Sequence, residues 1–369
     1  MSTKRGKSKH VKMSISKSAS KLRRNRADML KLLPKLDERV SVWDQHKLVK
    51  RSCPFCGSIG DPIYLRPDEL ETRQCEECGA FFISPAPDES VLSQFYLKYF
   101  LHHMDPICTR DKEILLSDPL DDFRVMQIAS LLNPRGKTLL DIGFGKGDAL
   151  VRFNKLGANV EGIEIDEDSI RFAKEELGIR NVGNFKLDQL ETSKRYDIIL
   201  MHDFLEHPLD PLFILTEARN RLKKGGLLSI WTPNASFVHY EKEPYLFRVD
   251  LEHLQFLTFK TCNYLARKLD LQLTHLESVG FPLVERIKRL SALNRNAARR
   301  KAAQKNKKRD FVTSSVNTIM RGTTVRNLPG YDFIKYYNRM RLARYEKNPR
   351  LGNYFLFCIL QEKHEKEIR

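Results

Sequence analysis

Residues 137–150 read KTLLDIGFGKGDAL. The apolar run predicts a buried strand, and Asp141, Gly143, Gly145 and Gly147 follow at alternate positions where the strand turns into a helix. Glycine permits a sharp turn and leaves room for a ligand against the backbone. A dinucleotide-binding turn would read G-x-G-x-x-G, whereas this turn reads D-x-G-x-G-x-G, and its carboxylate suits an ammonium group better than a pyrophosphate. A purely structural glycine turn is the alternative.

Short apolar runs alternate with helical patterns on both sides of this turn. We expect strands at 159–165, near Phe185, at 196–203 and at 227–234, and helices at 147–156, 168–177 and 211–223. Strands separated by about ten to fifteen helical residues are typical of a parallel, doubly wound sheet. A basic, helical insertion is expected between a strand at 273–280 and a last strand at 353–360.

Acidic residues follow the second and third expected strands. Glu164 lies about twenty residues after the glycines, where a carboxylate can accept both ribose hydroxyls of a nucleoside. Asp166 is the competing acid, and it can instead cap the following helix. Asp188 lies beyond the third strand, where such sites touch an adenine ring.

Four cysteines form two pairs, in CPFCG and CEECG, with eighteen residues between them: Cys53, Cys56, Cys75 and Cys78. Two residues between thiolates let one tight turn supply two ligands, and the glycine after each pair supports that turn. We predict a four-sulfur site for a structural Zn²⁺ ion, with no open coordination position. A redox dithiol would need only one pair, and disulfides are unusual in a chain without an export signal.

Charge is distributed unevenly along the 369 residues, of which 41% are hydrophobic. Residues 1–52 hold 16 basic and four acidic side chains, residues 286–309 hold 11 basic and no acidic ones, and the body between them is acidic. Basic runs are usually solvated tails or helix faces, so nucleic acid is the less favoured partner, and contact of the insertion with an anionic surface stays open. No run reaches the roughly 18 apolar residues of a membrane span, and a cytoplasmic location is expected.

The composition suggests five segments. We expect a basic, disordered tail at 1–26 and, at 27–100, an amphipathic helix (27–50) followed by a zinc-ribbon module. The α/β core follows at 101–280, the basic helical insertion at 281–350, and the last core strand with a tail at 351–369.

Taken together, these motifs resemble the class I S-adenosylmethionine-dependent methyltransferases. The resemblance covers about residues 120–280 and the final strand, through LDIGFGKGDAL, VEGIEID, YDIILMHDFLEHPLDP, RLKKGGLLSIWTPN and DLEHLQFLT. It implies a doubly wound, seven-stranded Rossmann-like methyltransferase sheet, with S-adenosyl-L-methionine as the cofactor. The residues implied to bind this cofactor are Asp141, Gly143, Gly145 and Gly147 at its methionyl end, Glu164 at the ribose, Asp188 at the adenine and His202 near the sulfonium.

The cysteine pairs, followed by FFISPAPDESVLSQFY, look like a zinc-ribbon subgroup of methyltransferases associated with sugar and cell-surface glycan modification. In DLEHLQFLT, Glu252 and His253 resemble the Glu-His pair of sugar C-methyltransferases, in which the His is the base. Those enzymes carry a Tyr three residues before the His, whereas this chain has Asp250. A packing or capping role for His253 is the alternative.

A second acceptor site competes with His253. Asp203, Glu206 and His207 in MHDFLEHPLDP are similar to residues that hold a divalent ion in ubiquinone-pathway O-methyltransferases, and a helix-start and packing role is the alternative. We therefore predict methyl transfer to a sugar or glycan acceptor. The alternatives are an RNA methyltransferase, a small-molecule O-methyltransferase of the ubiquinone-pathway type, and a scaffold that has lost catalysis.

Overall fold

The computed structural model describes residues 47–65, 70–96, 118–185, 187–191, 193–236, 253–279 and 355–363. The expected basic tail, the expected insertion and Glu252 lie outside the described residues. Of the helix expected at 27–50, only the last four residues are described. They include strand β1 (Leu48–Val49), which pairs antiparallel with β5 (Ala86–Pro87), so that this end of the expected helix is extended instead.

A seven-stranded sheet forms the centre of the structure, in the order β12-β13-β10-β9-β6-β7-β8. The strands are β6 (Thr138–Ile142), β7 (Asn159–Ile163), β8 (Val182–Gly183), β9 (Tyr196–His202), β10 (Leu222–Pro233), β12 (Gln272–Val279) and β13 (Phe355–Gln361). Strands β6 to β10 run parallel, and β13 is antiparallel to both of its neighbours. This confirms the predicted doubly wound, Rossmann-like α/β fold.

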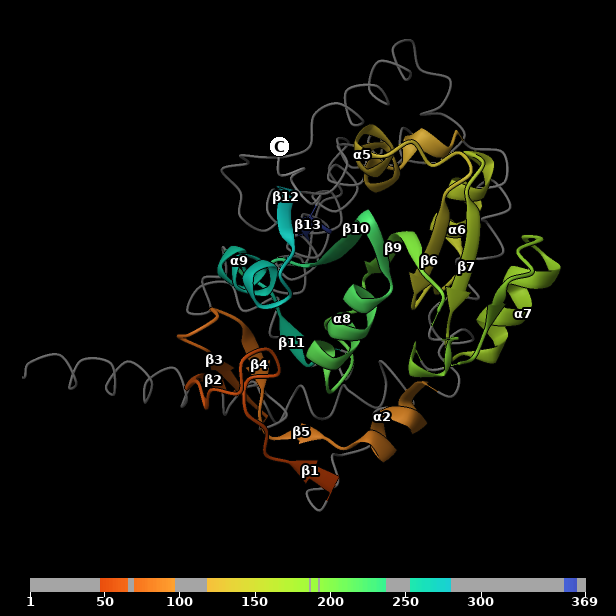
Figure 1. Cartoon of the computed structure of the whole chain (residues 1–369). Helices are drawn as coiled ribbons and strands as arrows, with labels where there is room; N and C mark the ends of the chain where they lie inside the picture. Colours follow the sequence, from red (N-terminus) through yellow and green to blue (C-terminus); the bar gives the residue numbers. More distant parts are fainter. Residues whose placement is uncertain are drawn as a thin grey trace, which may run out of the picture.

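Helices cover both faces of the sheet because successive side chains of each strand point to opposite faces. Leu139 packs in one core cluster with α5 (Phe123–Leu131), α6 (Asp148–Lys155) and α7 (Glu167–Glu175). Leu140, the next residue, packs in the other cluster with α8 (Pro211–Asn220) and α9 (Phe259–Lys268). In Figure 1, α6 and α7 lie near β7, and α8 and α9 lie toward the N-terminal strands.

The predicted junction between α8 and β10 was wrong. Helix α8 ends at Asn220, and Lys223, expected in the helix, belongs to β10. The register of β10 shifts between Leu222 and Leu227, where Gly225 has a φ of 73°. The short third strand, expected near Phe185, is β8 at Val182–Gly183, and the Phe185 ring folds back to within 2.3 Å of the position a Gly183 Cβ would take.

The N-terminal module is a small antiparallel sheet that incorporates a strand from the second half of the chain. Its order is β11-β4-β3-β2, with β2 (Asp61–Leu65), β3 (Glu71–Gln74), β4 (Phe81–Ile83) and β11 (Gln255–Phe256). Figure 1 shows these strands together below α9, and α2 (Glu89–Tyr96) follows them. The module is therefore built into the rest of the fold.

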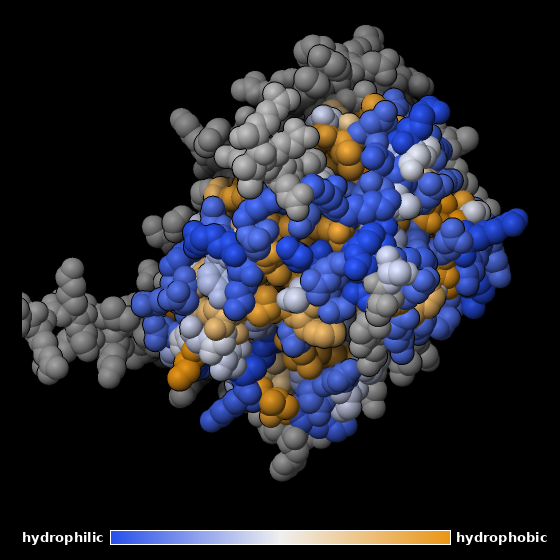
Figure 2. All heavy atoms as spheres, in the orientation of Figure 1, coloured by the Kyte–Doolittle hydropathy of each residue, from blue (hydrophilic) through white to orange (hydrophobic). Residues whose placement is uncertain are grey.

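The described surface is mixed in character. Hydrophilic side chains dominate the face in Figure 2, and the hydrophobic ones lie in patches between them. Among the described helices, none has the length and apolar character that crossing a bilayer requires.

Candidate functional site

The glycine turn after β6 has the backbone that its sequence predicts. Gly143, Gly145 and Gly147 have φ values of 72°, 54° and 79°, in the left-handed region that favours glycine. Gly147 is the N-cap of α6. A Cβ on Gly143 would lie 2.3 Å from Cδ2 of Phe204, so the aromatic ring packs directly on the turn.

Glu164 follows β7 and its carboxylate faces this turn. Its Oε2 accepts a hydrogen bond from the Gly145 amide at 2.9 Å, and its Oε1 accepts one from the Ile165 amide at 2.8 Å. Asp166 instead caps α7, since it accepts a hydrogen bond from the Ser169 amide at 2.8 Å. Glu164 is thus the acid that lies beside the glycines.

Asp141, at the end of β6, is only 3% exposed. Burial raises the pKa of Asp141 to about 7, while the nearby Arg124 charge opposes that shift and the Glu164 charge adds to it. The structure therefore brings Asp141, the three glycines and Glu164 to one edge of the sheet. Asp188 lies in the short helix η4 (Leu187–Gln189), and its side chain is not among those described.

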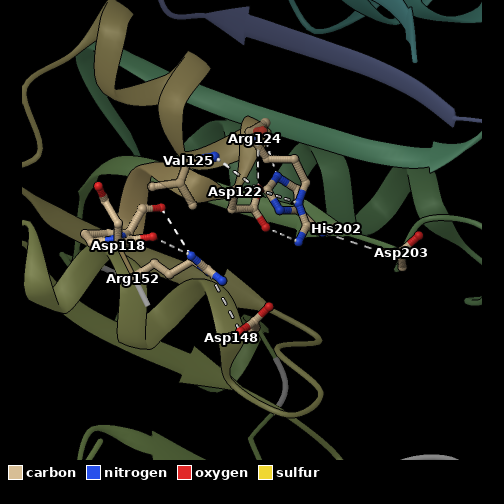
Figure 3. Close-up of polar contacts among 10 residues, drawn as sticks. Asp118, Asp122, Arg124, Val125, Asp148, Arg152, His202 and Asp203 are labelled. Atoms are coloured by element: carbon tan, nitrogen blue, oxygen red, sulfur yellow. Dashed lines mark hydrogen bonds and ion pairs between the residues drawn. The ribbon is translucent and has the colours of Figure 1, made fainter. Parts of the chain in front are cut away.

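An ion pair at the start of α5 was missed by the sequence analysis. Asp122 caps α5 and accepts hydrogen bonds from Nε and Nη2 of Arg124 at 3.1 and 2.7 Å (Figure 3). Burial opposes ionisation of Asp122, yet the Arg124 charge and its hydrogen bonds hold the pKa of this carboxyl below its usual range. The guanidinium also lies 5.5 Å from the ring centroid of Trp231.

Arg124 and Asp122 lie beside His202, at the end of β9 (Figure 3). Burial and the Arg124 charge lower the pKa of His202 to about 3, so the ring is neutral. Its Nε2 lies 2.8 Å from Oγ of Ser229. Its Nδ1 is buried and has no hydrogen-bond partner among the residues that the structure describes.

Glu206, His207 and His253 come together on the loops near β9 and β11. One potential ligand atom from each lies within 4.8 Å of the others, and the two imidazole centroids are 5.1 Å apart. Glu206 is fully buried and its Oε2 accepts a hydrogen bond from Thr232 at 2.9 Å. Burial raises the pKa of Glu206 to about 8, and the charge of Asp203 adds to this shift.

The two predicted acceptor sites are therefore one cluster, with His253 in place of Asp203. Asp203 is half exposed, has a φ of 51°, and lies 3.9 Å from Nη1 of Arg124. Tyr96 of α2 adds a neighbour that the sequence analysis missed, since its hydroxyl lies 3.0 Å from Nδ1 of His207. No sequence signal joins these residues, because they meet only through the fold.

The four cysteines converge as their spacing predicts. Sγ of Cys53 and Cys78 are 3.4 Å apart, Sγ of Cys56 and Cys75 are 3.3 Å apart, and all four lie within 4.8 Å of one another. Gly57 and Gly79 each donate an amide hydrogen bond back to the first cysteine of their pair, at 2.9 and 2.8 Å. Tetrahedral Zn²⁺ with Zn–S distances of about 2.3 Å needs sulfurs roughly 3.8 Å apart, so this donor set fits the ion.

A family model described as a methyltransferase domain matches residues 118–276, which include the glycine turn, Glu164 and the cluster of Glu206, His207 and His253. Residues 118–276 are therefore similar in sequence to a methyltransferase domain. The seven-stranded sheet, which also includes β13 beyond the matched residues, has the Rossmann-like methyltransferase fold.

This part of the chain is similar to two curated relatives named ubiquinone biosynthesis O-methyltransferase. That of Hydrogenovibrio crunogenus is 31% identical over 127 residues, 33% of this chain and 53% of the relative. That of Pelagibacter ubique is 30% identical over 144 residues, 38% of this chain and 58% of the relative. The chain thus spans little more than half the length of these relatives.

Among solved structures, a SAM dependent methyltransferase from Archaeoglobus fulgidus matches 69% of this chain and 99% of its own. The sequence identity is 19% and the TM-score is 0.40.

Proposed function

We propose that this chain is an S-adenosylmethionine-dependent O-methyltransferase whose acceptor is a small hydroxylated molecule. The observation that carries the proposal is the Glu206, His207 and His253 cluster, joined to the glycine turn through the packing of Phe204 on Gly143. The similarity to ubiquinone biosynthesis O-methyltransferases supports this acceptor class over the glycan predicted from the sequence alone.

Residues at the carboxyl ends of β6, β7 and β9 fit the cofactor. The left-handed glycines leave backbone exposed to a ligand, the buried Asp141 carboxyl suits an ammonium group, and Nδ1 of His202 lacks a partner among the described residues. Glu164 would hold the ribose and Arg124 would attract the methionyl carboxylate. S-adenosylmethionine, when bound, supplies an electrophilic methyl group.

The acceptor-side cluster would handle the proton of the hydroxyl group. We assign His253 as the general base, because a ring nitrogen of an imidazole can take that proton as the oxygen attacks the methyl carbon. The ring of His207 lies beside His253, and the hydroxyl of Tyr96 holds it through a contact of 3.0 Å to Nδ1 of His207. A carboxylate and two imidazoles also suit a divalent ion, which would compete for the same atoms.

The cysteine site is proposed to hold one structural Zn²⁺. The supporting observations are the separations between the sulfur atoms and the two glycine-supported turns. Four cysteine ligands would fill the tetrahedral coordination of the ion, so no position would remain open for a substrate or a catalytic water. Metal analysis of the purified chain should find about one zinc per chain, and Cys78→Ser should lower that content. A full-length chain without zinc would contradict the assignment.

A glycan acceptor is the second candidate. Its support is the four-cysteine cluster, because the cysteine pairs resemble those of a zinc-ribbon subgroup of methyltransferases associated with glycan modification. An RNA acceptor predicts affinity for bulk RNA that persists at physiological salt and falls steeply as salt rises, because phosphate contacts release counterions.

The acceptor class can be tested by product formation. The purified chain would be incubated with S-adenosylmethionine and either small phenols and other hydroxylated compounds or nucleotide sugars, and S-adenosylhomocysteine would be measured. We expect turnover with the first panel, and turnover with nucleotide sugars alone would favour the glycan candidate. His253→Ala should lower kcat by about 100-fold or more and spare cofactor affinity. His275→Ala, on β12, is the control.

A further inference from the structure

The cysteine module and the acceptor-side loop share a strand pairing. Gln255 pairs with Phe82 and Phe256 pairs with Phe81, while the amide of Ile83 donates to the carbonyl of Leu254 at 2.8 Å. Strand β4 follows the second cysteine pair directly. The backbone immediately after His253 is thus held by the module.

Gln255 continues this connection into the loop that carries Glu206 and His207. Its side chain is fully buried, and its Nε2 donates to the carbonyls of Leu205 and Pro208 at 2.7 Å each. The amide of Leu254 donates to the carbonyl of Glu206 at 2.8 Å. One short segment therefore holds both histidine-bearing loops.

Both cysteine turns hold this segment. Near the first, Nη2 of Arg51 donates to Oε1 of Gln255 at 2.9 Å, and Arg51 lies two residues before Cys53. Beside the second, the hydroxyl of Thr258 donates to the carbonyl of Gly79 at 3.1 Å, and Nζ of Lys260 donates to the carbonyl of Glu76.

We propose that metal binding by the four cysteines positions Glu206, His207 and His253. Gln255 is the positioning residue that connects the cysteine module to the loops that carry them. This inference rests on the proposed function, in which Glu206, His207 and His253 act on the acceptor. A metal ion fixes the two turns, the turns fix β4 and Arg51, and Gln255 then keeps the two loops together. Among the described residues, the hydrogen bonds of Glu164 and the glycine turn go to neighbours outside the module. Phe204, whose ring packs on Gly143, is not one of the residues whose carbonyls Gln255 holds. The cofactor side is therefore expected to keep its structure when the module loosens.

Hydrogen exchange on the full chain tests the first step without any acceptor. Zinc would be removed with a mercurial thiol reagent and a chelator, and amide exchange would be followed by mass spectrometry. We expect amides of residues 204–208 and 254–258 to exchange at least roughly tenfold faster, those of 139–166 to keep their rates, and S-adenosylhomocysteine affinity to change by less than about twofold. Unchanged protection at 204–208, or loss of cofactor affinity together with the metal, would overturn the proposal.

Gln255→Met tests the second step with the metal retained. The methionine has a similar volume but cannot donate to the carbonyls of Leu205 and Pro208. We expect zinc content and S-adenosylhomocysteine affinity to match the parent chain, exchange to rise at 204–208, and kcat to fall about 10- to 100-fold. Gln272→Met, at an exposed position of β12, is the matched control.

The two proposals fail in different ways. A chain that transfers no methyl group to any hydroxylated acceptor, but loosens at 204–208 when zinc leaves or Gln255 is replaced, contradicts the O-methyltransferase assignment and keeps the positioning role. A Gln255→Met chain with parental kcat and parental exchange removes the positioning role and leaves the function intact.

Discussion

Asp141 should make cofactor affinity depend on pH. Burial raises the pKa of this carboxyl to about 7, so the free protein holds a proton there at lower pH, whereas an ammonium group favours the ionised form. Affinity for S-adenosylhomocysteine should therefore rise with pH up to about 7, by roughly tenfold per unit well below 7, and then level off. Calorimetry between pH 5.5 and 8 measures this dependence.

The Asp141→Asn variant should bind S-adenosylhomocysteine more weakly than the parent chain, and its affinity should depend much less on pH. Asp270→Asn, in the exposed turn after α9, should retain the slope of the parent chain. The contribution of Asp141 to the stability of the folded, unliganded chain should fall as pH rises from about 4 to 7, because the folded state binds the Asp141 proton more tightly than the unfolded state does. His202, whose pKa is lowered, acts in the opposite direction in this range, so the Asp141 contribution is read from the difference between Asp141→Asn and the parent chain. A parental slope in Asp141→Asn would assign the pH dependence to another group.

Gly143 gives a second prediction, which concerns steric fit. Gly143→Ala adds a Cβ 2.3 Å from the Phe204 ring at a φ of 72°, so we expect a loss of roughly 2 to 4 kcal/mol in unfolding free energy. Gly136→Ala is a matched control, since its φ is 73° and nothing lies within 4 Å of the added atom. Equal losses in urea unfolding would show that the Phe204 contact relaxes without cost.

At the scale of an element, helix α5 depends on Asp122. Asp122→Ala removes an N-cap, worth about 1 kcal/mol, and leaves the partly buried Arg124 guanidinium without its hydrogen-bonded carboxylate, so a total loss of about 3 kcal/mol is expected. Asp118→Ala removes the exposed cap of the short helix η3 (Pro119–Asp121) and should cost only about 0.5 kcal/mol. Urea unfolding of both variants gives the comparison, and equal losses would mean that the ion pair adds nothing to the cap.

Most core elements could be predicted because their apolar periodicity is strong. Strands β6, β7 and β9 and helices α6 and α7 lie within about two residues of the expected bounds. The start of β10 was missed because Lys223, Gly225 and Gly226 form an irregular entry to the strand that resembles a helix end. Arg124 was missed because its importance comes from Asp122 and Trp231, which no local motif connects.

At the scale of the molecule, cofactor binding should stabilise the fold. S-adenosylhomocysteine at 100 times its Kd adds about 2.7 kcal/mol, which corresponds to a Tm increase of roughly 5 to 10 °C. Gly145→Val should abolish the increase, because its side chain fills the space that the glycine leaves beside Glu164. Differential scanning fluorimetry measures both, and a parental increase in Gly145→Val would place the ligand elsewhere.

The candidate site could be predicted only in parts. The glycine turn, Glu164 and the four cysteines lie in short motifs with fixed spacing, and the structure brings each set together. The meeting of His253 with Glu206 and His207 depends on β11 joining the N-terminal sheet. Strand β11 is only two residues long, which is too short to show a periodic pattern in the sequence, so this long-range pairing could not be predicted.

The position of β13 has a consequence for synthesis of the chain. This strand lies between β10 and β12, although residues 355–361 follow both of them in sequence. Until the ribosome has released residues 355–361, the facing edges of β10 and β12 have no native partner, and unpaired strand edges favour association between chains. A nascent chain of this protein therefore depends on late completion of its sheet, and chaperones that shield open edges would act during that interval.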